Sequence, residues 1–271
     1  MVKSKTARFF SGTYIGLMLL FLYAPILILI IFSFNGSKTL GHWTGFTLSW
    51  YRQLFRSKEI TDAIGVTLSV ALISATVSTV LGTAAAIGLH SMKKRSRVII
   101  ENISQLPMVN PDLVTGISLM LLFLFVGLRD GYTRLIIAHI SFNLPYVIFS
   151  VMPKLRQSSN MLYEAALDLG CSPMQAIWKV VVPDIMPGIV SGAILAFTLS
   201  IDDFVVSFFA GNGVDNLSMY IYASARRGVN PALSTIIFLP VVTLLLIVNL
   251  RSIREEKKQE IQSRKVGGSK Q

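Results

Sequence analysis

The sequence predicts an all-α integral membrane protein that crosses the bilayer six times. Apolar residues make up 52% of the 271 residues, charged residues only 14%, and the mean hydropathy is +0.61. These values are typical of a chain whose solvent is lipid rather than water. A helix needs about 20 apolar residues to cross a bilayer core of about 30 Å. Six runs close to that length occur, at residues 12–34, 63–90, 103–126, 135–152, 188–210 and 232–250.

The positive charges indicate which side of the membrane each loop faces. With both termini in the cytoplasm, 17 of the 25 Lys and Arg residues lie on the cytoplasmic side and 8 outside, as the positive-inside rule expects. The formal charge of +11 is therefore explained by topology and requires no nucleic acid. The transmembrane domain is expected to cover residues 1–250, and the polar residues 251–271 to form a disordered cytoplasmic tail.

The first two apolar runs carry further information about processing and packing. The first is too long for a secretory signal peptide and no small-residue cleavage site follows it, so we expect it to be retained. In the second, Ser74, Ser78, Gly82 and Ala86 recur at every fourth position and so share one helix face. Because small side chains let helix backbones approach closely in membranes, this face predicts a helix contact.

The sequence also excludes several kinds of chemistry. Cys171 is the only cysteine, so an internal disulfide and a multi-thiolate metal site are excluded, and the three histidines are far apart in sequence. No GxxxxGK[ST] phosphate loop occurs. We therefore expect no catalytic residue, no metal site and no cofactor in this chain, and any ATP and Mg to be bound by a partner.

Residues 153–187 form the most informative loop, which the charge count places in the cytoplasm. Asn160 suits the start of a short helix, and Gly170 suits the left-handed residue that ends it. Ser172, which precedes a proline, suits the start of a second helix, and Pro183 suits its end. The loop is thus predicted to form a helix, a turn and a second helix.

This loop carries a resemblance to a known family. Glu-Ala-Ala at 164–166, glycine at 170 and the apolar run 180–182 before Pro183 resemble the EAA loop of binding-protein-dependent ABC transporter permeases. In that family the loop docks onto an ATPase subunit. The resemblance implies the same coupling role for a set of loop residues, namely Glu164, Ala165, Ala166, Asp168 and Gly170.

Two other interpretations of the loop were weighed. A plain amphipathic return to the membrane is an alternative that the sequence leaves open. A DNA-binding helix-turn-helix has similar spacing, but its second helix would offer only Lys179 as a cation, and both of its ends are tethered to membrane spans. DNA binding is therefore disfavoured.

Carboxylates within apolar runs indicate a path for a cation. Asp202 and Asp203 stand inside the fifth run, where an ionised Asp costs about 2.5 to 3.5 kcal/mol on insertion scales. Asp112 stands in the third run, after Pro107 and Pro111. Prolines at that spacing remove backbone donors, so they predict a broken helix with an acid beside it.

Four further side chains were assessed for similar roles. Trp50 could hold an ammonium group on its aromatic face or could anchor the chain at the membrane interface. Ser200, one turn before Asp203, could donate to that acid, to cargo or to its own helix. His139 and Asn143 share a face of the fourth run, and we expect both to bond a neighbouring helix.

A second resemblance indicates one particular group of these permeases. The segments FTLSWY, NPDLVTGISL and LSIDDFVVS are similar to those of spermidine/putrescine ABC transporter permeases of the C type. This implies the fold of a type I ABC importer permease in a bacterial inner membrane. It also implies a homologous second permease, two ATP-binding cassette subunits and an extracytoplasmic polyamine-binding protein as partners, with no nucleic acid. The implied substrate path consists of Trp50, Asp112, Ser200, Asp202 and Asp203.

Other functions were considered beside polyamine import. The same scaffold could carry another cationic or small organic solute. From different classes, a membrane-embedded enzyme or an ion-coupled carrier could use the intramembrane aspartates as acid and base, metal ligands or a proton relay. No nucleophile–base set and no metal-ligand motif accompanies Asp202 and Asp203, which disfavours the enzyme.

Overall fold

The computed structural model describes residues 5–37, 42–158 and 160–227. In this part the chain is helical apart from loops and one isolated bridge between Asn35 and Phe46, which confirms the all-α prediction. The chain divides into two units, the first formed by Met1–Ser57 with Ala223–Gln271 and the second by Lys58–Tyr222. The predicted sixth run, 232–250, and the predicted tail, 251–271, lie outside the described residues.

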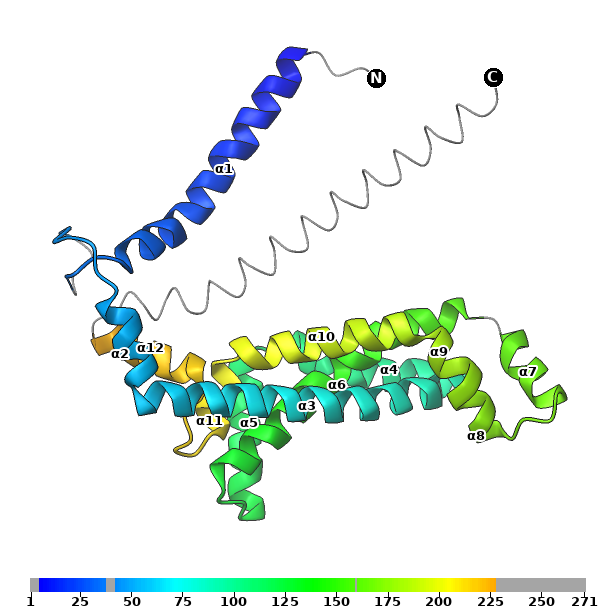
Figure 1. Ribbon diagram of the computed structural model, residues 1–271. Helices are drawn as coiled ribbons and strands as arrows, with labels where there is room; N and C mark the ends of the chain where they lie inside the picture. The colour runs from blue at the N-terminus through cyan, green and yellow to red at the C-terminus, as the bar shows by residue number, and fades with distance from the viewer. Residues whose placement is uncertain (1–4, 38–41, 159, 228–271) are drawn as a thin grey trace. The chain divides into compact units, whose positions relative to one another are not determined.

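The helices are labelled in Figure 1. The first unit contains α1 (Lys5–Phe32) and α2 (Ser49–Arg56), and α12 (Leu217–Arg227) runs from the second unit into the first. The second unit contains α3 (Lys58–Ser91), α4 (Lys94–Val109), α5 (Asp112–Val126), α6 (Gly131–Gln157), α7 (Asn160–Asp168), α8 (Pro173–Ala176), the π-helix η1 (Ile177–Val181), α9 (Val182–Asp184), α10 (Met186–Asp202) and α11 (Val205–Ala210).

Several of these helices could cross a membrane by length and composition. Among the described residues, three helical segments pass this test alone: Thr13–Phe32, Lys58–Ser91 and Gly131–Gln157. They coincide with the first, second and fourth predicted runs. Two bent pairs pass it together, one formed by α4 and α5 and one by Pro173–Asp184 with α10. The total of six spans and the cytoplasmic termini stay predictions.

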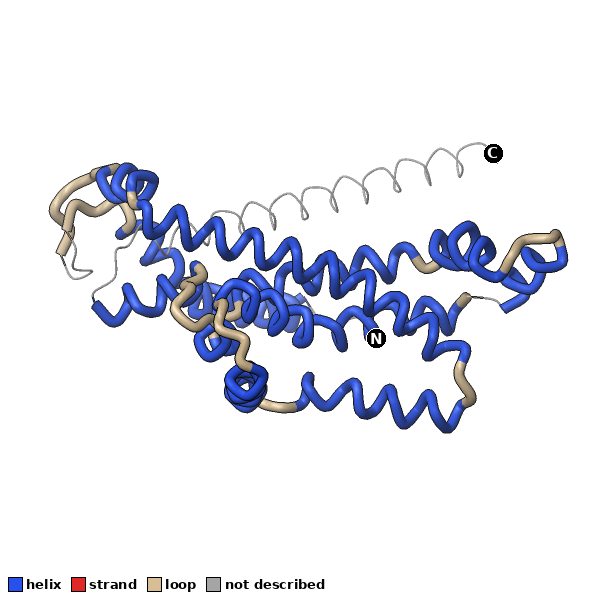
Figure 2. Tube along the Cα trace, turned by 90° about the horizontal axis from the view of Figure 1, so that it is seen from below, coloured by secondary structure: helices blue, strands red, loops and turns tan. Residues whose placement is uncertain are grey.

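The third predicted run, 103–126, is not one straight helix. Two extended residues, Asn110 (φ −69°, ψ 141°) and Pro111 (φ −56°, ψ 137°), separate α4 from α5. The two helices meet at an angle of 102°. Figure 2 shows this bend, because α5 is seen nearly end-on while α4 runs across the view. Pro111 has no N–H for a continuing helix and disfavours a helical Asn110, so the predicted break is confirmed.

The fifth predicted run, 188–210, is also interrupted. Helix α10 ends at Asp202, Asp203 is extended (φ −62°, ψ 123°), and α11 begins at Val205. The expectation of continuous helix through both acids was therefore wrong. Nothing in the composition of this run signals the break, because it contains neither proline nor glycine between Gly192 and Gly211.

Helices α3, α6 and α10 form the core of the second unit and lie side by side in Figure 1. The predicted small-residue face of α3 is the contact: Ser74, Ser78, Gly82 and Ala86 are all buried. A Cβ on Gly82 would lie 2.7 Å from Val147 Cγ1 of α6. Glycine is thus required at position 82 because the backbone of α3 approaches α6 too closely for a side chain.

Gly82→Ala should destabilise the protein by about 1 to 3 kcal/mol, because the added methyl overlaps Val147 in a packed core. The measurement is thermal unfolding of the purified membrane complex. Gly88→Ala is the matched control on the same helix, since a Cβ there meets nothing within 4 Å. Adding Val147→Ala to Gly82→Ala should restore part of the loss, and equal stability of the two glycine variants would contradict the close approach.

Candidate functional site

A buried polar cluster links four helices of the second unit near the end of α10. It consists of Ser74 on α3, His139 and Asn143 on α6, Ser200 on α10, Asp203 after α10, Ser207 on α11 and Asn216 before α12. Except for Asp203, whose side chain is 7% exposed, each of these residues is 3% exposed or less. Such groups are stable in a membrane only when they bond one another.

Ser200 connects three helices in the first part of this cluster. Its hydroxyl accepts a hydrogen bond from Asn143 Nδ2 at 2.7 Å and lies 3.1 Å from the hydroxyl of Ser74. The expectation that Asn143 bonds a neighbouring helix is thus confirmed. Ser200 bonds across helices rather than to Asp203.

Asp203 holds the break between α10 and α11. Its carboxylate accepts hydrogen bonds from the amides of Val206 (3.2 Å) and Ser207 (2.8 Å) and from the Ser207 hydroxyl (2.8 Å). The first amides of a helix have no partner within it, and a carboxylate there also meets the positive end of the helix dipole. The break is therefore stabilised by the acid that follows α10.

Two side chains outside α11 support this arrangement. His139 Nε2 of α6 lies 3.0 Å from the Ser207 hydroxyl and 3.6 Å from Asp203 Oδ2. Asn216 donates to the Asp203 carbonyl at 3.1 Å and to the Ser207 hydroxyl at 2.8 Å. The expected contact of His139 with a neighbouring helix is confirmed, and the roles of Ser207 and Asn216 were not predicted.

Asp202 has a different environment from its neighbour. It is the last residue of α10, its side chain is exposed, and it forms no ion pair within the described part of the chain. Of the two acids, Asp202 is thus the one available to a cation from outside the described chain.

Asp112 is likewise accessible at the other broken helix. It is the first residue of α5, directly after the extended Pro111, and its side chain is exposed. Gly116, one turn along α5, packs against α11, where a Cβ would lie 3.4 Å from the Cα of Val206. The segments that follow the two acidic breaks, α5 and α11, are therefore packed on each other.

Trp50 belongs to the first unit, on α2. Its side chain is 8% exposed, and its indole Nε1 donates to the Asn35 carbonyl at 2.7 Å. Asn35 is itself buried, and its side chain bonds the backbone of His42 and Thr44. In this conformation Trp50 holds the segment that follows α1 and does not present its face to solvent.

The predicted loop helices are present at the end of the second unit opposite α11 (Figure 1). Helix α7 starts at Asn160, and Gly170 follows it with φ +87°, the left-handed conformation expected there. Ser172 forms a capping box with Gln175 at the start of α8. The predicted helix–turn–helix is therefore confirmed, with η1 and α9 continuing the second helix to Asp184.

The loop presents the residues of the EAA-like motif outward. Glu164, Ala165, Asp168 and Gly170 are exposed, and Ala166 is buried. Large apolar side chains are exposed beside them: Met161 (77%), Leu169 (86%), Met174 (63%) and Trp178 (65%). Exposed apolar groups gathered on one short loop mark a protein contact surface.

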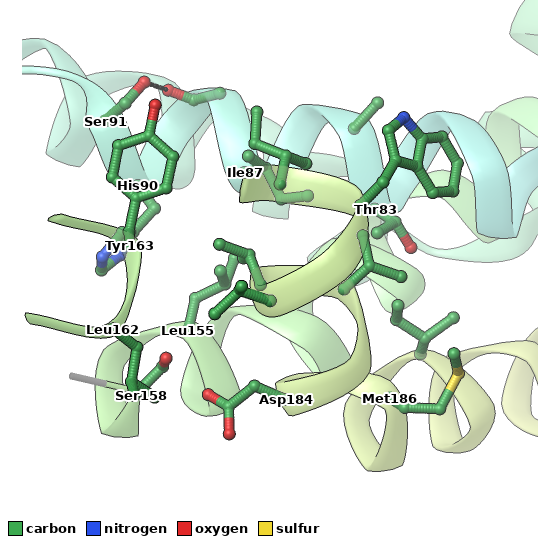
Figure 3. Close-up of a pocket in the computed structure, with 18 of the residues that line it drawn as sticks. Thr83, Ile87, His90, Ser91, Leu155, Ser158, Leu162, Tyr163, Asp184 and Met186 are labelled. Atoms are coloured by element: carbon green, nitrogen blue, oxygen red, sulfur yellow. Dashed lines mark hydrogen bonds between the residues drawn. The ribbon is translucent and has the colours of Figure 1, made fainter. Parts of the chain in front are cut away.

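A cavity of about 990 Å³ lies between these loop helices and the end of α3 (Figure 3). Thr83, Ile87 and His90 line it from α3, and Tyr163, Asp184 and Met186 line it from the loop and the start of α10. The cavity separates the loop helices from this part of α3. The end of the loop reaches the core of the second unit, where Ile185 is buried with Leu89 of α3 among the described residues.

Residues 78–253 match the protein family described as "Binding-protein-dependent transport system inner membrane component". The match includes both acidic breaks and the EAA-like loop. The chain belongs to this family. The membership confirms the predicted ABC importer permease and shows that this permease is a transport component rather than an enzyme.

Two relatives from Escherichia coli (strain K12) are similar over most of the permease. The present chain is 40% identical over 228 residues to a putrescine transport system permease protein, PotI, with 80% of this chain and 81% of the relative covered. It is 35% identical over 254 residues to a spermidine/putrescine transport system permease protein, PotC, with 92% and 96% covered. The predicted likeness to C-type permeases is therefore confirmed.

A solved structure shows the same fold. A chain of a bacterial ABC transporter involved in the import of the acidic polysaccharide alginate superimposes with a TM-score of 0.67, covering 93% of this permease and 98% of that chain. The identity is 16%, so this likeness concerns the fold alone.

Ser200→Ala should lower the stability of the permease by about 1 to 3 kcal/mol, because Asn143 would keep a buried amide without its acceptor. The measurement is thermal unfolding of the purified complex. Ser191→Ala is the control, since that hydroxyl is exposed on the same helix and bonds only its own backbone. A loss of transport with unchanged stability would instead indicate that Ser200 contacts the transported solute.

Proposed function

We propose that this permease is one half of the membrane pathway of an ATP-driven polyamine importer. The observation that carries the proposal is the 35–40% identity to two polyamine permeases over 80–92% of the chain. Polyamines carry several ammonium groups joined by short methylene chains, so their path needs separated acids. The two exposed acids beside broken helices, Asp112 and Asp202, meet that need.

The two acids at the end of α10, Asp202 and Asp203, have different roles in this proposal. Asp202 contacts an ammonium group of the cargo, because it is exposed at the end of α10. Asp203 keeps α11 in place through its hydrogen bonds to Val206 and Ser207 and thereby fixes where Asp202 points. Trp50 and Ser200 support the path as positioning residues, through the Asn35 carbonyl and the Asn143 amide.

Transport requires partners that this chain does not contain. In the proposal a homologous second permease completes the path, and two ATP-binding cassette subunits bind ATP and Mg and dock on Glu164, Ala165, Ala166, Asp168 and Gly170. An extracytoplasmic protein delivers the polyamine. The exposed apolar side chains beside the motif support the docking surface. With six spans and cytoplasmic termini, the loop lies on the ATPase side of a bacterial inner membrane.

Uptake of labelled putrescine and spermidine into vesicles that contain the complete complex tests the proposal. The expected result is accumulation of unchanged polyamine that requires ATP and the binding protein, and that other organic cations do not inhibit at equal concentration. Uptake that another cationic solute displaces would favour the alternative cargo on the same scaffold. Polyamine uptake that persists without the ATPase subunits would contradict the proposal.

The docking surface is tested in the same vesicles. Glu164→Arg should abolish uptake while the complex still inserts, because a positive charge replaces an exposed acid at the proposed ATPase contact. Glu59→Arg is the control, since it makes the same change at an exposed acid in the first turn of α3. Equal uptake by the two variants would remove Glu164 from the contact.

Asp202→Asn and Asp203→Asn should have separate effects. Asp202→Asn should raise the KM for polyamine about tenfold, corresponding to one lost charge contact of about 1.4 kcal/mol, with normal stability. Asp203→Asn should lower the stability of the complex, because an amide cannot accept all the hydrogen bonds at the start of α11. The measurements are concentration-dependent uptake and thermal unfolding, and a reversed pattern would exchange the two roles.

A further inference from the structure

An ion pair joins the first half of the broken helix to the end of α6. Arg156 Nη2 donates to both carboxylate oxygens of Glu101 on α4, at 2.9 and 2.8 Å. Arg97, one turn before Glu101 on α4, lies 3.9 Å from the same carboxylate. The Glu101 side chain is only 14% exposed, whereas that of Arg156 is 55% exposed. Charge-assisted bonds of this length to a largely covered acid are of the strong kind.

Arg156 and Glu101 lie at positions where movement of the loop after α6 would displace α4. Arg156 is in the last turn of α6, and α7 with Glu164 begins four residues later at Asn160. Glu101 lies in the middle of α4, about 12 Å along the helix from Val109. Directly beyond Val109 come the extended residues of the break and then Asp112. The ion pair thus joins the start of the loop at residues 153–187, called the docking loop below, to α4. Helix α4 in turn leads to Asp112 of the proposed substrate path.

Helix α4 contacts α6 and α3 without burying side chains in the described part of the chain. No residue of α4 is buried, in contrast with α3 and α6, which bury residues along most of their length. The Glu101–Arg156 pair is thus a strong contact between α4 and α6 where apolar burial contributes little.

We propose that the Glu101–Arg156 ion pair couples the docking loop to the broken helix, so that ATPase-driven movement of α7 displaces α4 and reorients Asp112. The proposal rests on the proposed function. Helix α4 runs unbroken from Glu101 to Val109, although it contains Pro107, so a displacement at Glu101 reaches the break. Of the two extended residues that follow it, Asn110 keeps an amide hydrogen bond to the Leu106 carbonyl (3.1 Å), whereas Pro111 has no N–H. The rotation is therefore absorbed between Asn110 and Asp112. Glu101 and Arg156 are thus positioning residues that act through Asp112.

Charge-exchange variants of the complete complex test this role. Glu101→Gln and Arg156→Gln should each lower the number of polyamines imported per ATP hydrolysed by about fivefold, the lower range of usual coupling effects. The double variant Glu101→Arg with Arg156→Glu should restore most of that ratio. Arg95→Gln, at an exposed cation on the same helix, should leave it unchanged. If the pair only stabilised the fold, Glu101→Gln and Arg156→Gln would lower the melting temperature and leave the ratio of polyamine imported to ATP hydrolysed unchanged. That result would overturn the proposal.

A distance measurement tests the coupling role without relying on polyamine transport. With Cys171→Ser, spin labels at Asn102 on α4 and Gln157 at the end of α6 report whether the two helices move together. The distance should stay the same with and without ATP in the otherwise native complex, and should change on ATP binding when Glu101→Gln is added. An ATP-dependent change already present with Glu101 intact would overturn the coupling role. A wild-type complex without polyamine uptake but with the expected distances would instead contradict only the proposed function.

Discussion

A helix that begins inside a membrane leaves its first peptide N–H groups without a partner that lipid can supply, and the structure of this permease depends on how that demand is met. At the end of α10 the carboxylate of Asp203 accepts the amides of Val206 and Ser207 and, with His139 and Asn216, fixes the start of α11. The carboxylate of Asp203 therefore bonds groups of the protein itself. Asp202, one residue earlier, is left exposed.

The close packing of α3, α6 and α10 gives this arrangement a rigid base. Gly82 lets α3 approach Val147 of α6, and Ser74, Asn143 and Ser200 bond one another across the three helices. The docking loop follows directly from the end of α6 but is capped by its own residues and separated from part of α3 by a cavity. A firm core with a less tightly held loop suits a protein in which nucleotide-driven movement enters at the loop.

The features that sequence predicted well are local ones. The limits of α7 and the start of α8 follow from Asn160, Gly170 and Ser172, whose preferences are set within a few residues, and the bend after α4 follows from Pro111. The sequence did not predict which of Asp202 and Asp203 is exposed, because the break after α10 is stabilised by α6 and by Asn216 rather than by a proline. The ion pair between Glu101 and Arg156 was missed for a similar reason, since its partners lie 55 residues apart.

We infer that Asp203 secures the break while Asp202 binds the cargo. A cryo-EM structure of the complete complex with a polyamine held in the membrane would separate these two roles. We expect an ammonium group within hydrogen-bond distance of the Asp202 carboxylate, with Asp203 still bonded to the amides of α11. An ammonium group on Asp203, or a helix that continues unbroken from α10 into α11, would contradict this inference.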